Sequence, residues 1–149
     1  MKYVGIDYGV RSAHIAIIND KDLTVHTIST DKLDSRQDEL IYIRSKVEQF
    51  LSDIDIVVIE SPVLAGPRNL QVLISMSQVC GVLLTSCTPH TAVTVAVASW
   101  KKEIVGKGNA SKEEVANWLE KYYPDFYNKC QRQDHIDATC IALYGKLIS

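Results

Sequence analysis

The chain has 149 residues, 46% of them hydrophobic and 23% charged, with a formal net charge of -2. This length suits a single domain over residues 1–149 and is too short for two lobes of comparable size. No apolar run approaches the roughly 20 residues of a membrane helix, and the charge argues against a protein that simply coats nucleic acid. Because Asp7 and Arg11 interrupt the first apolar stretch, we expect no signal peptide and an intracellular location.

The N-terminal stretch predicts a hairpin that ends its first strand on an acid. The apolar run Tyr3–Ile6 predicts a short strand, Gly9 marks a turn, and Ser12–Ile18 predicts a second strand. Asp7 is therefore expected at a strand mouth, where a carboxylate can face a cleft. The alternative is that Asp7 and Gly9 are only turn residues, since both residue types suit hairpins whatever the function.

The next two elements complete a meander and start a crossover. Leu23–Thr30 alternates apolar and polar residues, which predicts a third strand with His26 on its surface. Ser35 opens a capping-box pattern, and apolar residues at helical spacing predict a helix over about 36–52. The charged face of that helix, which includes Glu39, is expected to be solvated.

A buried parallel strand follows and also ends on an acid. The run Ile54–Ile59 is rich in β-branched residues and almost continuously apolar, which predicts a central strand covered on both faces. A right-handed crossover would set it parallel to the first strand and bring Asp7 and Glu60 together at the carboxyl edge, where open α/β sheets bind ligands. Glu60 either pairs with a neighbouring cation or belongs to a site, because a carboxylate there is otherwise costly. With Asp7 beside it, we favour the site.

The middle of the chain is mainly structural. Gly66–Asn69 is predicted as a loop, Leu70–Ser86 as a long apolar helix and Val93–Val97 as a fifth strand. The cysteines show no C-x-x-C pair and no zinc-like histidine spacing, so buried free thiols are expected. They are Cys80, Cys87, Cys130 and Cys140.

A basic segment with two glycines precedes the next helix. Ser111 and Glu114 form a capping box that predicts a helix over about 111–123. A basic, glycine-containing loop beside a helix N-terminus can bind phosphates. The alternative is a solvated loop, which the segment by itself favours. Its lysines are Lys101, Lys102, Lys107 and Lys112.

The last helix begins with two acids. Asp134 and Asp137 are three residues apart, so they share one face of the helix. Acidic residues in a first turn also suit the helix dipole, which makes capping the alternative explanation.

Acids at two parallel strand ends and on a final helix form the ribonuclease-H-like nuclease pattern, and the chain resembles the RuvC Holliday-junction resolvases. Each matching segment is weak alone, but together they follow the family's order over nearly the whole chain. The segments are Gly5-Ile6-Asp7-x-Gly9, Val58-Ile59-Glu60, Lys101-x-x-x-Val105-Gly106-x-Gly108-x-Ala110-x-Lys112, and Asp134-x-x-Asp137-Ala138 with Ile141-Ala142.

The resemblance implies an α/β, ribonuclease-H-like fold, in which helices flank a mixed five-stranded sheet made of an antiparallel meander and two parallel strands. It implies a homodimer that nicks two strands of a four-way DNA junction symmetrically. It also implies that two Mg²⁺ ions, for which Mn²⁺ substitutes, are held by Asp7, Glu60, Asp134 and Asp137.

DNA contacts are expected from the same resemblance. Lys101 and Lys112 would contact phosphate near the scissile bond and take part in catalysis. Further contacts are expected from the rest of the basic segment and from the loop before the long apolar helix. These residues are Lys102, Lys107, Arg68 and Asn69.

Two positions depart from the family pattern. Bacterial RuvC-like enzymes usually carry a proline after the first aspartate, where this chain has Tyr8. They also carry an aromatic wedge three residues after the glutamate, where this chain has Val63. The departures leave the junction-opening mode and the sequence preference open, and are compatible with a virus-encoded or organellar variant.

The chemistry makes independent sense of the acids. Phosphodiester hydrolysis needs an activated water and a stabilised leaving oxyanion, which two divalent ions about 4 Å apart supply. Mg²⁺ prefers carboxylate oxygens as ligands.

Three alternative functions fit part of this pattern. A ribonuclease-H-type enzyme on RNA–DNA hybrid would share the fold and the metals. A junction-binding protein without cleavage activity is disfavoured by the complete acidic set. Asp7-x-Gly9-x-x-Ser12 also resembles the phosphate loop of actin-like kinases, but that fold needs two lobes.

Overall fold

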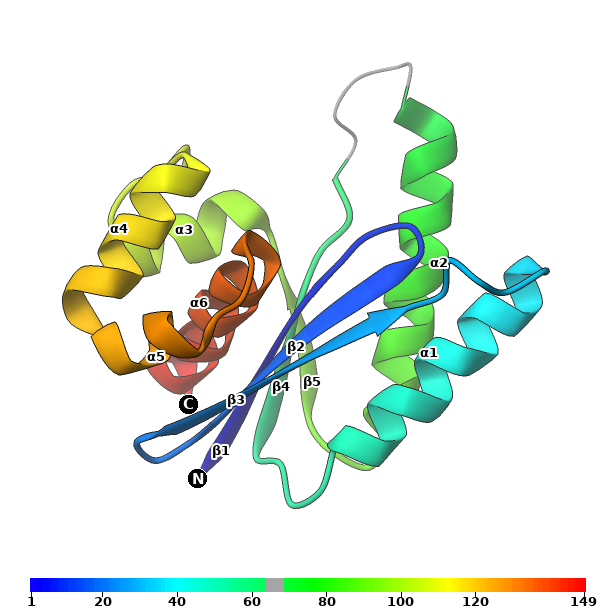
Figure 1. Ribbon diagram of the computed structural model, residues 1–149, viewed down its shortest axis with the longest axis horizontal. Coiled ribbons are helices and arrows are strands. Elements are labelled where there is room, and N and C mark those ends of the chain that lie inside the picture. The colour runs from blue at the N-terminus through cyan, green and yellow to red at the C-terminus, as the bar shows by residue number, and fades with distance from the viewer. Residues whose placement is uncertain (64–68) are drawn as a thin grey trace.

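A five-stranded sheet in the order β3-β2-β1-β4-β5 forms the centre of the computed structural model, which describes residues 1–63 and 69–149 (Figure 1). The first three strands form an antiparallel meander, and β4 and β5 continue the sheet in parallel with β1. The strands are β1 (Lys2–Tyr8), β2 (Ser12–Asn19), β3 (Asp22–Ser29), β4 (Ile56–Glu60) and β5 (Ala92–Val95). This topology confirms the predicted α/β, ribonuclease-H-like architecture.

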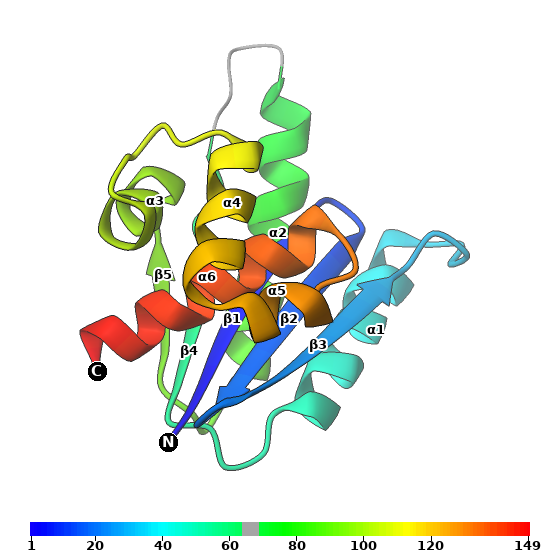
Figure 2. The same cartoon turned by 60° about the vertical axis from the view of Figure 1, so that its left-hand side comes forward.

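Helices cover both faces of the sheet. On one side lie α1 (Arg36–Phe50) and α2 (Leu70–Ser86). On the other, α6 (Gln133–Ile148) lies directly on the sheet and is itself covered by smaller helices (Figures 1 and 2). Of these, α3 (Val97–Val105) and α4 (Lys112–Tyr122) pack against α6, and α5 (Pro124–Lys129) packs against α4 and β3. In the described part of the chain, none of these helices has the length and apolar content needed to cross a bilayer.

The alternation of side chains along β1 separates two cores. Tyr3 packs in the core under α6, whereas Val4 and Ile6 pack in the core under α1 and α2. Because successive strand residues point to opposite faces, Gly5 and Asp7 face α6 with Tyr3.

Gly5 lets α6 approach the sheet closely. A Cβ atom built at Gly5 would lie 2.1 Å from the carbonyl oxygen of Ala138 and 2.3 Å from the amide nitrogen of Ala142. No side chain fits at that distance, so only glycine permits this approach of helix to strand. The approach brings the first turn of α6 to the end of β1.

The basic segment is more helical than predicted. The predicted strand Val93–Val97 ends at Val95, and α3 begins at Val97. Trp100 is fully buried and anchors this helix, although the neighbouring lysines make the segment resemble a loop in the sequence. Gly106 adopts the left-handed conformation (φ 92°) that ends the helix.

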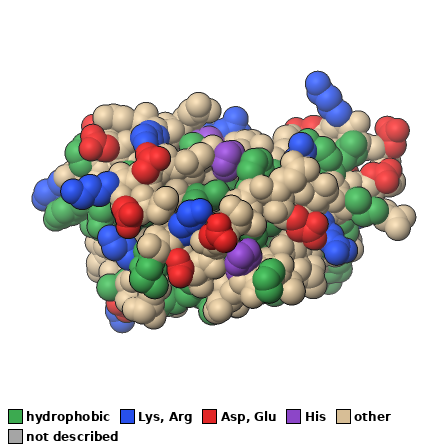
Figure 3. Space-filling model, turned by 90° about the horizontal axis from the view of Figure 1, so that it is seen from below, with side chains coloured by type: hydrophobic (Ala, Val, Ile, Leu, Met, Phe, Trp, Pro, Cys, Tyr) green, Lys and Arg blue, Asp and Glu red, His purple; other side chains and the backbone are tan. Residues whose placement is uncertain are grey.

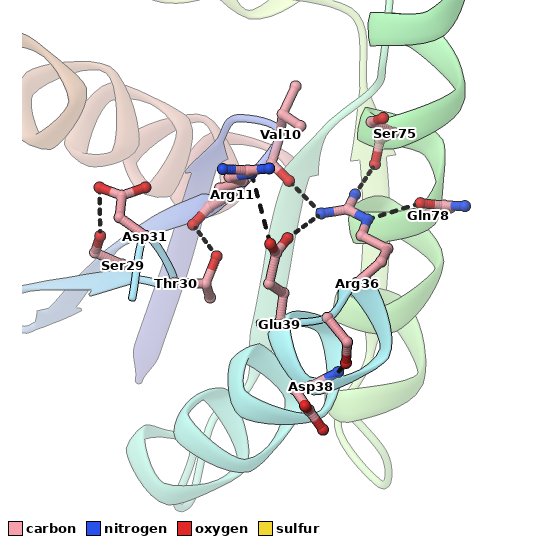
Figure 4. A network of polar contacts seen from close by, with 11 residues as sticks. Val10, Arg11, Ser29, Thr30, Asp31, Arg36, Asp38, Glu39, Ser75 and Gln78 are labelled. Carbon is pink, nitrogen blue, oxygen red and sulfur yellow. Dashed lines mark hydrogen bonds and ion pairs between the residues drawn. The ribbon is translucent and has the colours of Figure 1, made fainter. Parts of the chain in front are cut away.

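Glu39 is buried, contrary to the prediction that it is solvated (Figure 4). Its carboxylate pairs with Arg36 at 2.9 Å and with Arg11, on the turn after β1, at 3.5 Å. A buried carboxylate needs such partners, and the Arg11 side chain lies far away in sequence. Arg36 also donates to the carbonyl oxygens of Val10 (2.6 Å) and Ser75 (2.7 Å) and to the side chain of Gln78 (2.8 Å). The network therefore ties the β1–β2 turn to α1 and α2.

The remaining local predictions are largely confirmed. Ser35 caps α1, and the capping box of Ser111 with Glu114 opens α4. The cysteines are free thiols, although that of Cys130 is only partly buried. His26 is not simply a surface residue, because its ring stacks on Phe50 with 4.0 Å between centroids.

Candidate active site

A row of polar side chains crosses the sheet near the carboxyl end of β1. Asp7 is paired with His14 on β2, and His14 is paired with Thr27 on β3. Glu60 ends β4, one step beyond the last residues of that strand that pair with β1. Directly paired residues point to the same face, so these side chains all face α6.

The N-terminal part of α6 adds Asp134 and Asp137 to this row. Burial, followed by the negative charges of Glu60, Asp137 and Asp134, raises the pKa of Asp7 to about 9. The structure thus brings together the acids that the sequence places on separate elements. The mutual repulsion of these carboxylates is what a bound cation would offset.

Glu60 and Asp137 also have raised pKa values, and each has a neutral N–H group beside it. Burial raises the pKa values of Glu60 and Asp137. Trp100 Nε1 donates to Glu60 Oε2 at 2.7 Å, and Gln133 Nε2 donates to Asp137 Oδ1 at 3.0 Å. Both hydrogen bonds favour the charged carboxylates and so lower these pKa values.

Sequence reasoning missed these neighbours. Gln133 and Asp137 are four residues apart on one helix, a spacing that could have indicated the pair. Trp100 stands next to Lys101 in the matched motif, but its contact with Glu60 depends on the packing of α3 against β4. His14, whose Nε2 lies 3.4 Å from Asp134 Oδ2, could only have been found from the strand register.

The acids suit hard divalent cations in their chemistry. Carboxylate oxygens are the preferred ligands of Mg²⁺, and a bound cation would reverse the repulsion that raises the pKa of Asp7. Within residues 1–63 and 69–149, no three histidine, cysteine, aspartate or glutamate side chains form a tightly grouped ligand set. The donor set therefore fits such ions by composition and charge, while its side chains are spread more widely than a closed coordination shell.

Lys101 and Lys112 border the acids. The positive charge of Lys101 lowers the pKa values of Glu60 and Asp137, and that of Lys112 lowers the pKa of Asp137. Lys101 Nζ also donates to the carbonyl oxygen of Ala110 at 3.0 Å, which ties α3 to the start of α4. Both lysines therefore stand beside the carboxylates with their charge directed at the site.

The other predicted DNA contacts are placed differently. Lys107 is paired with Glu114 at 3.2 Å, and Lys102 lies in the last turn of α3. Asn69 is the N-cap residue of α2. Arg68 lies outside the described residues.

The two departures from the family pattern lie in different surroundings. Tyr8 points away from the acids and is buried on the side of α1 and α2, where its hydroxyl lies beside the thiol of Cys80 and burial raises its pKa. Because its side chain lies on the other face, Tyr8 in place of the family's proline adds no side chain to the α6 face beside Asp7. Val63 is 52% exposed just after β4.

Comparison with known proteins agrees with this architecture. A family model described as crossover junction endodeoxyribonuclease RuvC matches residues 3–144. No curated protein sequence matches the chain.

Several solved structures share the fold. Thermus thermophilus RuvC has a TM-score of 0.78 and 18% identity over 99% of this chain and 96% of that one. T. thermophilus RuvC in complex with Holliday junction substrate has a TM-score of 0.81, with the same 18% identity and the same 99% and 96% coverage. The fowlpox virus Holliday junction resolvase has a TM-score of 0.52 and 16% identity over 100% of both chains. Such low identities show the fold, and the family match over almost the whole sequence shows more: the chain belongs to the RuvC family of crossover junction endodeoxyribonucleases.

Proposed function

We propose that the chain is a divalent-metal-dependent endonuclease that resolves four-way DNA junctions by paired, symmetric nicks. The observation that carries the proposal is the cluster of Glu60, Asp134 and Asp137 around Asp7, at the carboxyl end of adjacent parallel strands. Membership of the RuvC family supports it. So does the fold shared with T. thermophilus RuvC, a structure of which contains Holliday junction substrate.

In this proposal the acids hold two Mg²⁺ ions, and Mn²⁺ can replace Mg²⁺. When bound, such ions supply an activated water and stabilise the leaving oxyanion. The protein positions the ligands, because Trp100 and Gln133 each fix the orientation of one carboxylate. Lys101 and Lys112 place positive charge where negative charge develops on the phosphate.

A direct test compares labelled four-way junction, linear duplex and RNA–DNA hybrid, each with and without Mg²⁺. We expect paired nicks in the junction only when Mg²⁺ is present. Cleavage of the hybrid in preference to the junction would identify a ribonuclease-H-type enzyme instead. Junction binding without nicking in Mg²⁺ or Mn²⁺ would identify a binding protein.

We also propose a homodimer with α2 at its interface. A junction presents two equivalent strands, whereas one chain carries one acidic site, so symmetric nicking requires two copies. The solvent-facing side of α2 carries apolar and small residues at alternating spacings of four and three, the pattern of helix pairs. These residues are Leu70, Ile74, Ser77, Gly81 and Leu84, of which Leu70 is 57%, Ile74 45% and Leu84 38% exposed.

Ile74→Glu is expected to convert the dimer into a monomer, because it places a charge in the middle of this apolar stripe. Light scattering should give about twice the 16.6 kDa chain mass for the wild type and the chain mass for the variant. Tyr122→Glu, a similar change at an exposed aromatic residue on α4, should leave the dimer intact. A wild-type protein that binds a junction as a single chain would contradict the proposal.

Lys101→Ala and Lys112→Ala are each expected to slow cleavage and to lower the salt dependence of junction binding. Loss of one phosphate contact should reduce the slope of log affinity against log salt by about one unit. Lys46→Ala on α1, on the far side of the sheet from the acids, serves as the control with an unchanged slope. If both site variants keep the wild-type slope, neither lysine contacts phosphate.

The opposite end of the sheet offers a contrast with the proposed DNA-binding region. Figure 3 views the molecule from that end, where acidic and basic side chains are interspersed. Such a mixed surface gives little net attraction for a polyanion. By contrast, Lys101 on α3 and Lys112 on α4 place positive charge beside the acids.

A further inference from the structure

Asp134 adjoins a set of polar side chains that lie outside the acidic cluster. His14 on β2, Thr27 on β3 and His135 on α6 form a continuous line of polar contacts, which we call the histidine chain. His135 Nε2 lies 2.7 Å from Thr27 Oγ1, and Thr27 Oγ1 lies 3.3 Å from His14 Nδ1. His14 Nε2 then faces Asp134 Oδ2 at 3.4 Å.

One backbone group sets the direction of every hydrogen in this chain. The amide N–H of Gln131 donates to His135 Nδ1 at 3.2 Å. That nitrogen therefore has no proton, and the single ring proton of His135 is on Nε2, which donates to Thr27 Oγ1. The Thr27 hydroxyl then donates its own hydrogen to His14 Nδ1, which leaves the proton of His14 on Nε2, toward Asp134.

The histidine chain lies at the interface between the sheet and α6. His14 is 4% exposed and His135 3% exposed, and their rings meet edge to face with 5.8 Å between centroids. Buried polar groups at such an interface hold a defined arrangement because each needs its partner.

The Asp134 side chain is 49% exposed, so solvent leaves its carboxylate free to rotate unless a neighbour restrains it. A neutral N–H group restrains an ionised carboxylate without cancelling the charge that a cation needs. Glu60 has such a donor in Trp100, and Asp137 has one in Gln133. The 3.4 Å separation is longer than a normal N–H···O hydrogen bond, and a small rotation of the exposed Asp134 side chain would bring the two atoms within hydrogen-bonding distance.

We propose that the histidine chain is a positioning device that orients the Asp134 carboxylate for a divalent cation, with His14 as the residue in contact. The inference rests on the proposed role of Asp134 as a metal ligand. It adds residues of β2 and β3 to the function of the site. It also assigns to His14, Thr27 and His135 a shared role that depends on the direction of their hydrogen bonds.

The test measures the Mg²⁺ concentration that gives half-maximal junction cleavage. His14→Leu, which removes the N–H group, should raise it about 10- to 100-fold, the usual effect of losing a residue that orients a metal ligand. His14→Gln, whose amide nitrogen reaches a similar position, should recover most of the loss. Thr27→Val should also raise this Mg²⁺ concentration, whereas Thr27→Ser, which keeps the hydroxyl, should match the wild type.

Two further measurements separate positioning from packing. Junction affinity in Ca²⁺ should be the same for all these variants, because the change concerns the metal and not the DNA. In the wild-type protein, nitrogen NMR of the imidazoles at the assay pH should show both rings neutral and protonated at Nε2. A proton on Nδ1 of either ring, or a charged ring, would overturn the proposed direction without any substitution.

Asp134→Asn distinguishes failure of this inference from failure of the proposed site. If Asp134→Asn leaves the Mg²⁺ requirement unchanged, Asp134 is not a ligand and the proposed site is wrong there. If Asp134→Asn raises the requirement but His14→Leu and Thr27→Val do not, the site stands and the histidine chain only packs. If His14→Gln is as impaired as His14→Leu, the N–H group of His14 is not what matters.

Discussion

Asp7→Asn is expected to abolish junction cleavage while leaving junction binding intact. The amide keeps the shape of the side chain but removes a negatively charged ligand at the centre of the acidic cluster. Nicking in Mg²⁺ and gel-shift in Ca²⁺ separate the two effects on the same junction. We expect no nicking above the metal-free background, with an affinity close to that of the wild type.

The same substitution should make the metal-free protein melt at a higher temperature. Two like charges 4 Å apart repel by about 1 kcal/mol in water and about 4 kcal/mol at an effective dielectric constant of 20. Burial and the negative charges of three nearby carboxyl groups together raise the pKa of Asp7 to about 9. Folded Asp7 must either stay charged against this repulsion or take up a proton, and both cost stability at neutral pH; the amide of Asp7→Asn does neither.

The pH dependence of stability follows from the direction of this shift. A carboxyl group whose pKa is higher in the folded than in the unfolded protein binds more protons when folded. The metal-free wild type should thus lose stability as pH rises from about 4, near the unfolded value of 3.8, toward about 9. Melting at pH 5, 7 and 9 should show a shallower decline for Asp7→Asn, with the rest contributed by Glu60 and Asp137, whose pKa values are also raised.

Added Mg²⁺ should stabilise the wild type more than Asp7→Asn. A ligand that binds only the folded state stabilises by mass action, by about 2.7 kcal/mol at 100 times its dissociation constant. Equal metal-induced shifts in the two proteins would show that Asp7 is not a ligand. Persistent nicking by Asp7→Asn would lead to the same conclusion and return Asp7 to the role of a turn residue.

Gly5→Ala is expected to destabilise the fold by about 3 kcal/mol or more and to reduce cleavage beyond the loss of folded protein. The added methyl group would lie 2.1 Å from a backbone oxygen of α6, which cannot rotate away as a side chain can. The helix must therefore move, and Asp134 and Asp137 move with it. Denaturant unfolding gives the free energy, and cleavage per folded molecule gives the effect on the site.

Gly145→Ala is the matched control for this prediction. It makes the same change at the same helix–sheet interface, but its closest neighbour is a methyl group, Val58 Cγ2, at 3.0 Å. The expected cost is about 1 kcal/mol, at the low end for an overpacked site, with cleavage per folded molecule unchanged. If Gly5→Ala costs no more than Gly145→Ala, the close approach of α6 to β1 does not determine the position of the acids.

Local patterns in the sequence were sufficient for the elements that carry the acids. The continuous apolarity of Ile54–Ile59 predicted a buried strand that ends on Glu60, and β4 has this form. The spacing of Asp134 and Asp137 predicted that they share a helix face, which depends only on the geometry of a helix. The order of the motifs also indicated the family, which the match over residues 3–144 confirms.

Tertiary structure decided which groups surround those acids, because their partners are distant in the chain. Trp100 donates to Glu60 across 40 residues, and His135 meets Thr27 across 108 residues. Strand register places His14 beside Asp7, and a turn residue, Arg11, helps to neutralise buried Glu39, which by local pattern alone looked solvated. Helical and strand periodicities indicate which side of an element is apolar. The charge state and orientation of a buried polar group depend instead on the distant residues that packing brings close to it.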